Sequence, residues 1–229
     1  MPSTLAKAFQ QMAAVAAKDI RSELRTRFAL NSLAMVAVVT VVVLVYAARE
    51  EVKVPVGIAS GMLWVSMFFT AVTGLGRTFV SEEERGTVLL LRLTTSAIPV
   101  YFGKLLVNLL FAVGVNAVVG MLYLFFSTNV QLGSPFALVI VLLLCSFGFA
   151  ASLTIASAII ARSSSKSALF PVLCFPILLP LMVLGIDLLG RAFAGAALGV
   201  MAEPLLLLLL YSVLVIVVSY ILFDSLWKE

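Results

Sequence analysis

Long apolar runs alternate with short polar stretches along the chain, and this pattern predicts a helical membrane protein. Six runs are long enough to cross about 30 Å of hydrocarbon at about 1.5 Å of helix per residue. The predicted transmembrane helices are 28–48, 55–75, 100–126, 136–161, 168–186 and 204–223. The alternation over about ten residues that marks a membrane β-strand is missing. We therefore expect an all-α membrane protein with six transmembrane helices. Residues 1–229 are expected to form one transmembrane domain, with the spans paired in 28–75, 100–161 and 168–223.

The segment before the first run, 1–27, carries apolar residues at spacings of three and four. These positions are Leu5, Phe9, Met12, Ala16, Ile20 and Leu24. Polar residues stand between them, and Lys18, Arg21 and Arg25 make the polar face basic. This pattern is typical of an amphipathic helix that lies in the membrane interface. The alternative is a short solvated leader, which the periodicity disfavours.

The longest polar interval, 76–99, lies between the second and third spans and contains three consecutive glutamates. Ser81 and Glu84, three residues later, fit a capping box, and acidic residues suit the first turn of a helix. The apolar residues from Val88 to Leu93 could bury one face against the bundle. We predict a short cytoplasmic helix lying flat under the membrane, with its glutamates facing the cytosol. Pro99 is expected to mark the start of the third span.

This interval is the predicted docking surface for a partner protein. The residues assigned to it are Arg77, Ser81, Glu82, Glu83, Glu84, Arg85, Gly86 and Thr87. Gly86 allows a bend or a close backbone approach, and Thr87 adds a polar contact beside it. The alternative is a solvated acidic loop that balances nearby arginines, whose exposed ion pairs contribute about 0–1 kcal/mol each.

A second unusual segment, 187–204, separates the last two predicted spans. It is apolar and rich in Gly and Ala, yet it carries Arg191 and Glu203 and ends in Pro204. It is too interrupted to span a membrane, and irregular backbone at membrane depth must be buried in protein or line a cavity. We predict a re-entrant or interfacial elbow here.

Charge sets the expected orientation. Only 11% of the residues are charged, against about 25% in a soluble domain, and the net charge is +4. Most of the lysines and arginines fall in the segments that share a side with the N-terminus, whereas the other side holds Arg49, Lys53 and Arg191. Positive loops stay in the cytoplasm, so both termini are predicted to be cytoplasmic in a bacterial inner membrane. The same rule explains the positive charge without nucleic-acid binding.

Groups that could perform chemistry within the membrane are scarce. The chain has no histidine, no P-loop motif and no pair of carboxylates within a span, and Cys145 and Cys174 lie inside apolar runs. Lys104, near the inner end of the third span, is expected to extend its ammonium to the cytoplasmic surface. Asn108 and Asn116 are expected to bond helix to helix. These features favour a transport permease, without cofactor or metal of its own, driven by a separate ATPase subunit.

Several stretches resemble a known family. The stretch "EEERGTVLLLRLTTSAIPVYFGKLL", 82–106, resembles the coupling-helix pattern of ABC-2 type permeases, and the chain as a whole resembles haem exporter protein B, the CcmB permease family. The other matching stretches are "KDIRSELRTR" (18–27), "GMLWVSMFF" (61–69), "GLGRTF" (74–79), "GKLLVNLLF" (103–111) and "FPVLCFPILLPLMVLG" (170–185). One departure is that Val88 to Leu91 are all apolar where many members have a polar or acidic residue.

The resemblance implies a permease homodimer bound to two copies of a cytosolic ATPase that binds the ATP. It also implies a haem-handling membrane protein and a haem chaperone as partners, haem as cargo of the complex, and membrane lipid around it. Two alternatives stay open: an ABC-2 permease that exports a lipid, glycan or drug, and a non-transporting scaffold for the ATPase.

Overall fold

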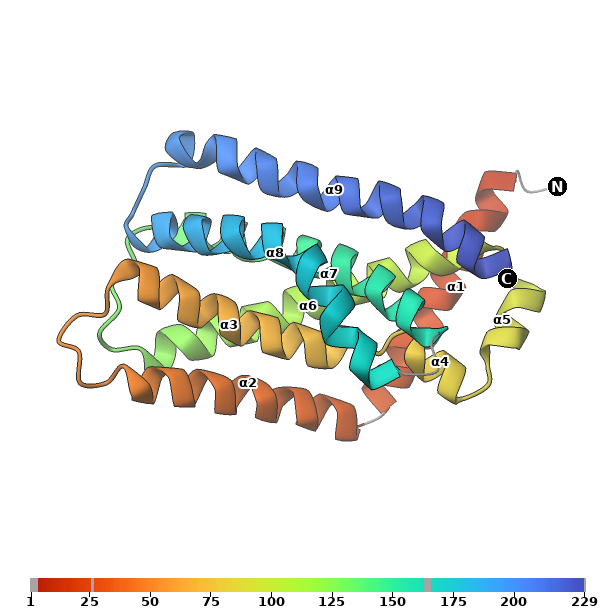
Figure 1. Ribbon diagram of the computed structural model, residues 1–229, viewed down its shortest axis with the longest axis horizontal. Coiled ribbons are helices and arrows are strands. Elements are labelled where there is room, and N and C mark those ends of the chain that lie inside the picture. The colour runs from red at the N-terminus through yellow and green to blue at the C-terminus, as the bar shows by residue number, and fades with distance from the viewer. Residues whose placement is uncertain (1–3, 26, 163–165, 229) are drawn as a thin grey trace.

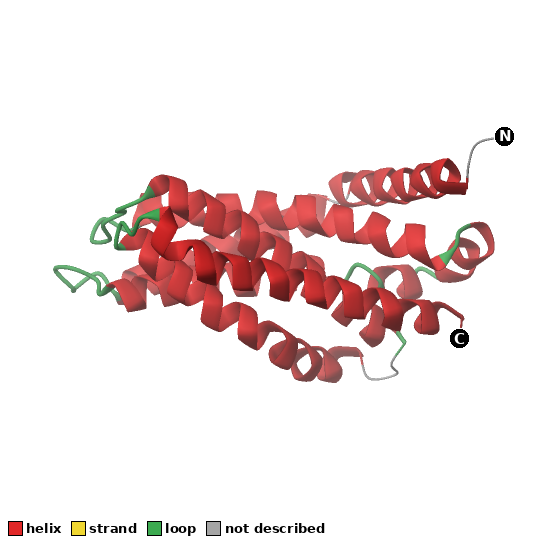
Figure 2. Ribbon diagram, turned by 90° about the horizontal axis from the view of Figure 1, so that it is seen from above, coloured by secondary structure: helices red, strands yellow, loops and turns green. Residues whose placement is uncertain are grey.

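The computed structural model describes residues 4–25, 27–162 and 166–228, with side chains over 6–23, 31–162 and 172–227. Within these ranges every regular element is a helix and no strand occurs (Figure 2). The helices are α1 (Thr4–Arg25), α2 (Arg27–Ala47), α3 (Val56–Leu75), α4 (Val80–Glu84), α5 (Val88–Thr94), α6 (Ala97–Phe126), α7 (Pro135–Ala161), α8 (Lys166–Phe193) and α9 (Leu198–Lys228). The predicted all-α class is confirmed.

The helices α2, α3, α6, α7, α8 and α9 run along the long axis of the molecule, and we call them the long helices for this reason (Figure 1). The three others, α1, α4 and α5, gather at one end, where both ends of the chain also lie (Figure 1). We call this the α5 end. The opposite end, which we call the loop end, holds the connections 48–55, 127–134 and 194–197 (Figure 1).

Five helical stretches are long and apolar enough to cross a membrane. They are Val56–Glu84, Ala97–Phe126, Pro135–Ala161, Val172–Phe193 and Leu198–Trp227. The described part of the first predicted span, Asn31–Ala47, is also apolar but shorter. The third span begins at Ala97, three residues before the predicted boundary at 100, because Pro99 fits in the first turn of α6, where its missing N–H has no helical partner to lose.

α7 forms the centre of the bundle and packs against α6, α8 and α9. Its middle is built from small residues, among them Ala150, Ala151 and Ala156, which let neighbouring helices approach closely. Gly148 lies at the tightest crossing, where a Cβ would meet side chains of Leu181 and Ser212. By contrast, only 17% of the most apolar stretch of α9 is buried, so most of its leucine face points away from the bundle.

The loop end is held together by backbone hydrogen bonds between connections that are far apart in sequence. Gly133 N–H donates to Phe193 O at 3.0 Å, and Ser134 N–H donates to Ala192 O at 3.0 Å. Ser134 then caps α7 by accepting from Ala137 N–H at 3.4 Å. The two glycines Gly133 and Gly195 touch backbone to backbone, which leaves no room for a side chain at Gly133.

The predicted re-entrant elbow at 187–204 is wrong. α8 continues to Phe193 and α9 begins at Leu198, so only 194–197 form a connection. Pro204 lies inside α9, where it cannot donate to the Val200 carbonyl four residues earlier. Arg191 Nη1 donates to that oxygen at 3.4 Å, so a side chain from α8 replaces the lost helical bond. Arg191 also pairs with Asp187 at 2.8 Å.

Candidate functional site at the α5 end

The interval between the second and third long helices forms two short helices rather than one. α4 ends at Glu84, α5 begins at Val88, and Gly86 between them has a φ of 67°, which L residues with a side chain rarely adopt. The predicted bend at Gly86 is therefore confirmed. The predicted capping box is wrong: α4 begins at Val80 with Phe79 as its N-cap, and the Ser81 hydroxyl donates to Thr78 O at 3.3 Å instead.

Glu82 was predicted to face the cytosol, but it is buried. Its side chain is 9% exposed and lies between two lysines from other helices, Lys18 of α1 and Lys104 of α6. Lys18 donates to its carboxylate, and Lys104 Nζ lies 3.2 Å from Oε1. The Thr87 hydroxyl also donates to this carboxylate, so Thr87 turns inward rather than presenting a polar contact to a partner. Glu82 is a structural anchor of α4.

Lys104 is the most deeply buried charge in this cluster, with a side chain only 1% exposed. Its ammonium pairs with Asp19 of α1 at 2.9 Å and donates to Thr78 O at 3.2 Å. It also lies 5.1 Å from the centre of the Phe79 ring, within range of a cation–π contact. The prediction that Lys104 extends to the cytoplasmic surface is wrong, because paired carboxylates meet it inside the protein.

We call the buried residues Asp19, Glu82 and Lys104, together with the half-exposed Lys18, the buried ion cluster. Its two positive and two negative charges sum to zero, so the charges of its three buried members are balanced. Burial acts to lower the pKa of Lys18, but its hydrogen bond to Glu82 and the charges of Asp19 and Glu82 outweigh burial, and the pKa lies above its usual value. Lys18 is therefore charged throughout the physiological pH range. A cavity of about 40 Å³ beside the cluster has room for water.

Hydrogen bonds continue from the cluster into the bundle. The Thr78 hydroxyl donates to Asn108 Oδ1 at 2.7 Å, and Asn108 Nδ2 donates to Thr154 of α7 at 2.7 Å. Phe79 N–H donates to Ser157 of α7 at 2.8 Å. The expected helix-to-helix role of the asparagines is confirmed, since Asn116 also bonds to Ser146 at 2.9 Å. The start of α4 is thus fixed to both α6 and α7.

The remaining predicted site residues lie at the surface. Glu83 and Glu84 are exposed, and Glu84 pairs with the exposed Arg77 at 3.0 Å. Arg85 is also exposed and donates to Ser22 of α1 at 2.8 Å. Two of the three glutamates therefore remain available to a partner.

The prediction that the apolar residues of α5 bury one face against the bundle holds only in part. Leu91 is half-buried and packs against the core. Leu89, Leu90 and Leu93 are 68%, 65% and 78% exposed, and no residue of α5 is fully buried. α5 is also attached through Arg92, whose guanidinium lies 5.5 Å from the Trp227 ring centre and donates to Leu226 O at 3.3 Å. The helix projects beyond the ends of the long helices, so the three exposed leucines form an apolar surface at the tip of the molecule (Figure 1).

The predicted amphipathic helix α1 lies obliquely across the α5 end and packs on α6 (Figure 1). Val15, Ala16 and Asp19 are buried, and Gly103 of α6 lies close enough to Val15 that a Cβ there would meet it at 3.1 Å. Phe9, assigned to the apolar face, is 67% exposed. Arg21 of the predicted basic face is exposed, whereas the Arg25 side chain lies outside the described residues.

Sequence analysis missed Asp19 and Lys104 as members of this site. One signal was available: Lys104 is the only charged residue in 97–126, and an ionisable side chain inside an apolar span calls for a partner. Its partners come from segments 85 and 22 residues away, which no local pattern reveals.

Comparison with protein-family models matches residues 10–226 to the model described as CcmB protein. The chain belongs to the CcmB protein family. The match includes the whole of α2 to α8 and all four residues of the buried ion cluster. Comparisons with curated proteins and with solved structures each found no match.

Membership of the CcmB family confirms the resemblance to haem exporter protein B. It makes the chain a multi-pass transmembrane permease, a component of the haem-export machinery of cytochrome c maturation. CcmB proteins belong to an ABC transporter that includes a partner ATPase and further maturation components.

Proposed function

We propose that this CcmB chain is the membrane subunit on which a cytosolic ATPase docks through α4 and α5. The observation that carries the proposal is the surface at the tip of the α5 end. There two exposed carboxylates, Glu83 and Glu84, lie beside three exposed leucines of α5. An apolar centre with a charged rim is the usual anatomy of a protein interface. A partner groove with an apolar floor and a basic rim would complement it.

The buried ion cluster gives this docking surface a rigid base. Glu82 ties α4 to α1 and α6, and Arg92 ties α5 to the end of α9. Displacement of α4 and α5 by the ATPase would therefore act on α1, α6 and α9 together. This is how we propose that ATP hydrolysis on the partner is coupled to haem handling and to release of the haem-loaded chaperone.

The assembly that we propose around this surface is the one that membership of the CcmB family implies. Two copies of the chain pair as a homodimer in the bacterial cytoplasmic membrane, each with six spans that include α2. Haem is the cargo of the complex, handled together with a haem-handling membrane protein and a haem chaperone, while this chain binds no cofactor of its own. Membrane lipid surrounds α1 and the long helices.

The orientation places the α5 end and both termini in the cytoplasm, supported by the distribution of lysines and arginines. In intact cells, Glu51→Cys and Gln131→Cys, both exposed at the loop end, should react with an impermeant thiol reagent added outside. Glu83→Cys at the α5 end should react only after the membrane is permeabilised. The native cysteines Cys145 and Cys174 are buried and give a low background. Outside labelling of Glu83→Cys would refute the orientation.

Copurification tests the docking surface directly. The double variant Glu83→Lys/Glu84→Lys, which leaves the buried Glu82 in place, should insert and fold but lose the ATPase and cytochrome c maturation. The variant Leu89→Ser/Leu90→Ser/Leu93→Ser should lose the ATPase as well, because apolar anchors at the centre of an interface carry most of its affinity. Glu84→Lys removes the exposed Arg77–Glu84 ion pair. This loss lowers the free energy of unfolding by only about 0–1 kcal/mol, which is too little to unfold the bundle.

The matched control is Glu50→Lys/Glu51→Lys, the same charge reversal on exposed residues at the loop end. This control should keep both the ATPase and cytochrome c maturation. If the α4 and α5 variants copurify with the ATPase in wild-type amounts, the surface is a solvated face and the proposal fails.

A further inference from the structure

A pocket at the loop end has the two-part lining of a lipid site. Its cavity of about 220 Å³ lies between the end of α2, the turn before α3 and the end of α6. The walls are apolar and include Val42, Val45, Met62 and Phe126. The rim is polar and includes Arg49 and the hydroxyl residues Ser127 and Thr128. An occupant must therefore be apolar at one end and polar at the other.

The rim is preformed by hydrogen bonds between two connections. Asn129 Nδ2 donates to Glu51 O at 2.7 Å, and Val54 N–H donates to Asn129 O at 3.3 Å. Thr128 Oγ1 donates to Asn129 Oδ1 at 3.2 Å. These bonds hold 127–130 against 51–54, so a ligand at the rim meets a fixed surface and does not have to order a loop.

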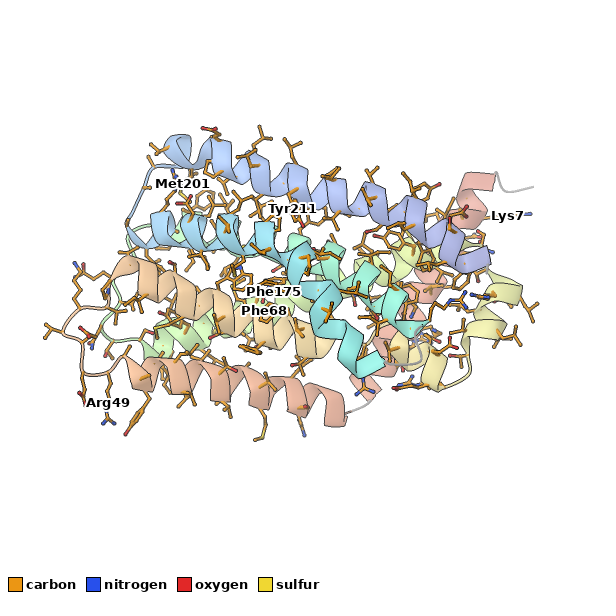
Figure 3. All side chains as sticks on the ribbon, in the orientation of Figure 1. Lys7, Arg49, Phe68, Phe175, Met201 and Tyr211 are labelled. Atoms are coloured by element: carbon orange, nitrogen blue, oxygen red, sulfur yellow. The ribbon has the colours of Figure 1, made fainter. Side chains whose placement is uncertain are left out.

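Arg49 supplies the charge that selects the ligand. Its guanidinium carbon lies 3.9 Å from the centre of the Tyr46 ring. This cation–π contact holds the guanidinium at the end of α2. Its nearest carboxylate, on Glu50, lies 3.7 Å away on a side chain that is 87% exposed, so this pair is weak. A guanidinium with five N–H donors matches a phosphate, which can take two of them at once. Figure 3 shows Arg49 pointing outward from the end of the bundle.

The depth of the pocket agrees with a lipid head group. Tyr46 is 62% exposed, and exposed tyrosines concentrate where a membrane meets water. The exposed Val39, Val42 and Val43 on α2 continue from it into the apolar stretch of the helix. The pocket therefore opens along α2 from the hydrocarbon region to the head-group level.

We propose that this pocket binds one anionic glycerophospholipid, with its phosphate on Arg49 and an acyl chain along Val45, Met62 and Phe126. The site goes beyond the proposed function and does not depend on the ATPase, but it requires that α2 lies in the bilayer. The lipid would fill the space between the ends of α2 and α6 and brace the two helices against each other.

Native mass spectrometry of the full chain, in nanodiscs that contain phosphatidylglycerol and phosphatidylcholine in equal amounts, tests the site. The wild-type chain should retain one phosphatidylglycerol more firmly than phosphatidylcholine. Arg49→Gln should lower this retention about fivefold, the effect of about 1 kcal/mol per basic residue near a lipid surface. Val45→Trp, which fills the apolar part, should lower it as well while leaving the charge in place.

Lys53→Gln is the matched control, because it removes an exposed positive charge at the same end but does not line this pocket. It should retain phosphatidylglycerol as the wild type does. Equal losses in Lys53→Gln and Arg49→Gln would show general attraction to anionic lipid and overturn the proposal. An excess of inorganic phosphate should leave the bound lipid in place, and displacement by phosphate would show a plain anion site and overturn it too.

Discussion

Lys104→Met is expected to destabilise the chain by about 3–5 kcal/mol, the usual consequence of removing one partner of a buried ion pair. Methionine has similar length and suits the apolar surroundings, so the loss comes from charge rather than shape. Asp19 and Glu82, whose side chains are 10% and 9% exposed, would keep only Lys18 as a counter-charge. Thermal unfolding of the purified chain in detergent should show a markedly lower midpoint, and hydrogen exchange should show faster opening of α1 and α4.

Restoring neutrality should restore stability. In the Lys104→Met background, Asp19→Asn removes the uncompensated carboxylate and leaves Lys18 and Glu82 as one neutral pair, so most of the lost stability should return. Lys53→Met, the same substitution at an exposed position of the loop end, should change the midpoint little. Wild-type stability of Lys104→Met, or no recovery in the Lys104→Met/Asp19→Asn variant, would show that Lys104 does not hold the cluster together.

Gly133→Ala should also destabilise the fold strongly, by about 3 kcal/mol or more. A Cβ at this position would lie 2.5 Å from the Gly195 Cα and 2.8 Å from Phe193 O. These neighbours are backbone atoms, so they cannot move aside as a flexible side chain can. Relief of the clash would break the hydrogen bonds from Gly133 and Ser134 to the end of α8, and with them the cap of α7.

Three other glycines provide controls for that substitution. Gly57, Gly61 and Gly114 have no atom within 4 Å of a built Cβ, so alanine should be neutral or slightly stabilising in these helices. The unfolding midpoint in detergent would again be the measurement. If Gly133→Ala unfolds at the same temperature as Gly114→Ala, the contact between the two connections is looser than the structure has it.

The sequence allowed prediction of the features that depend on length and periodicity. Five of the six predicted spans coincide with helices that are long and apolar enough to cross a membrane, and the spacing of three and four residues located α1. Gly86 was expected to allow a bend or a close backbone approach, and its φ of 67° in the left-handed region fits the bend. These signals are local, so neighbouring residues are enough to read them.

The errors concern contacts between distant segments. Glu82 was expected in solvent because glutamate usually lies there, but two lysines from α1 and α6 neutralise it. The apolar residues of α5 were expected to bury one face because leucine is usually buried, but of its leucines only Leu91 packs against the core and the other three stay exposed. The elbow was expected because the Gly- and Ala-rich segment, interrupted by Arg191 and Glu203, looked too short to span, but α8 and α9 extend into it and Arg191 replaces the helical bond that Pro204 cannot make.

The separation between Asp19 and Lys104 has a consequence for biosynthesis. The two residues are 85 positions apart, so α1 leaves the ribosome long before its buried partner exists. During that time Lys18 and Asp19 must remain hydrated, and the amphipathic helix can rest on the membrane surface. Docking of α1 becomes favourable only after the third span has been inserted and has brought Lys104 to the same side. The N-terminal helix is therefore synthesised well before it can reach its native place.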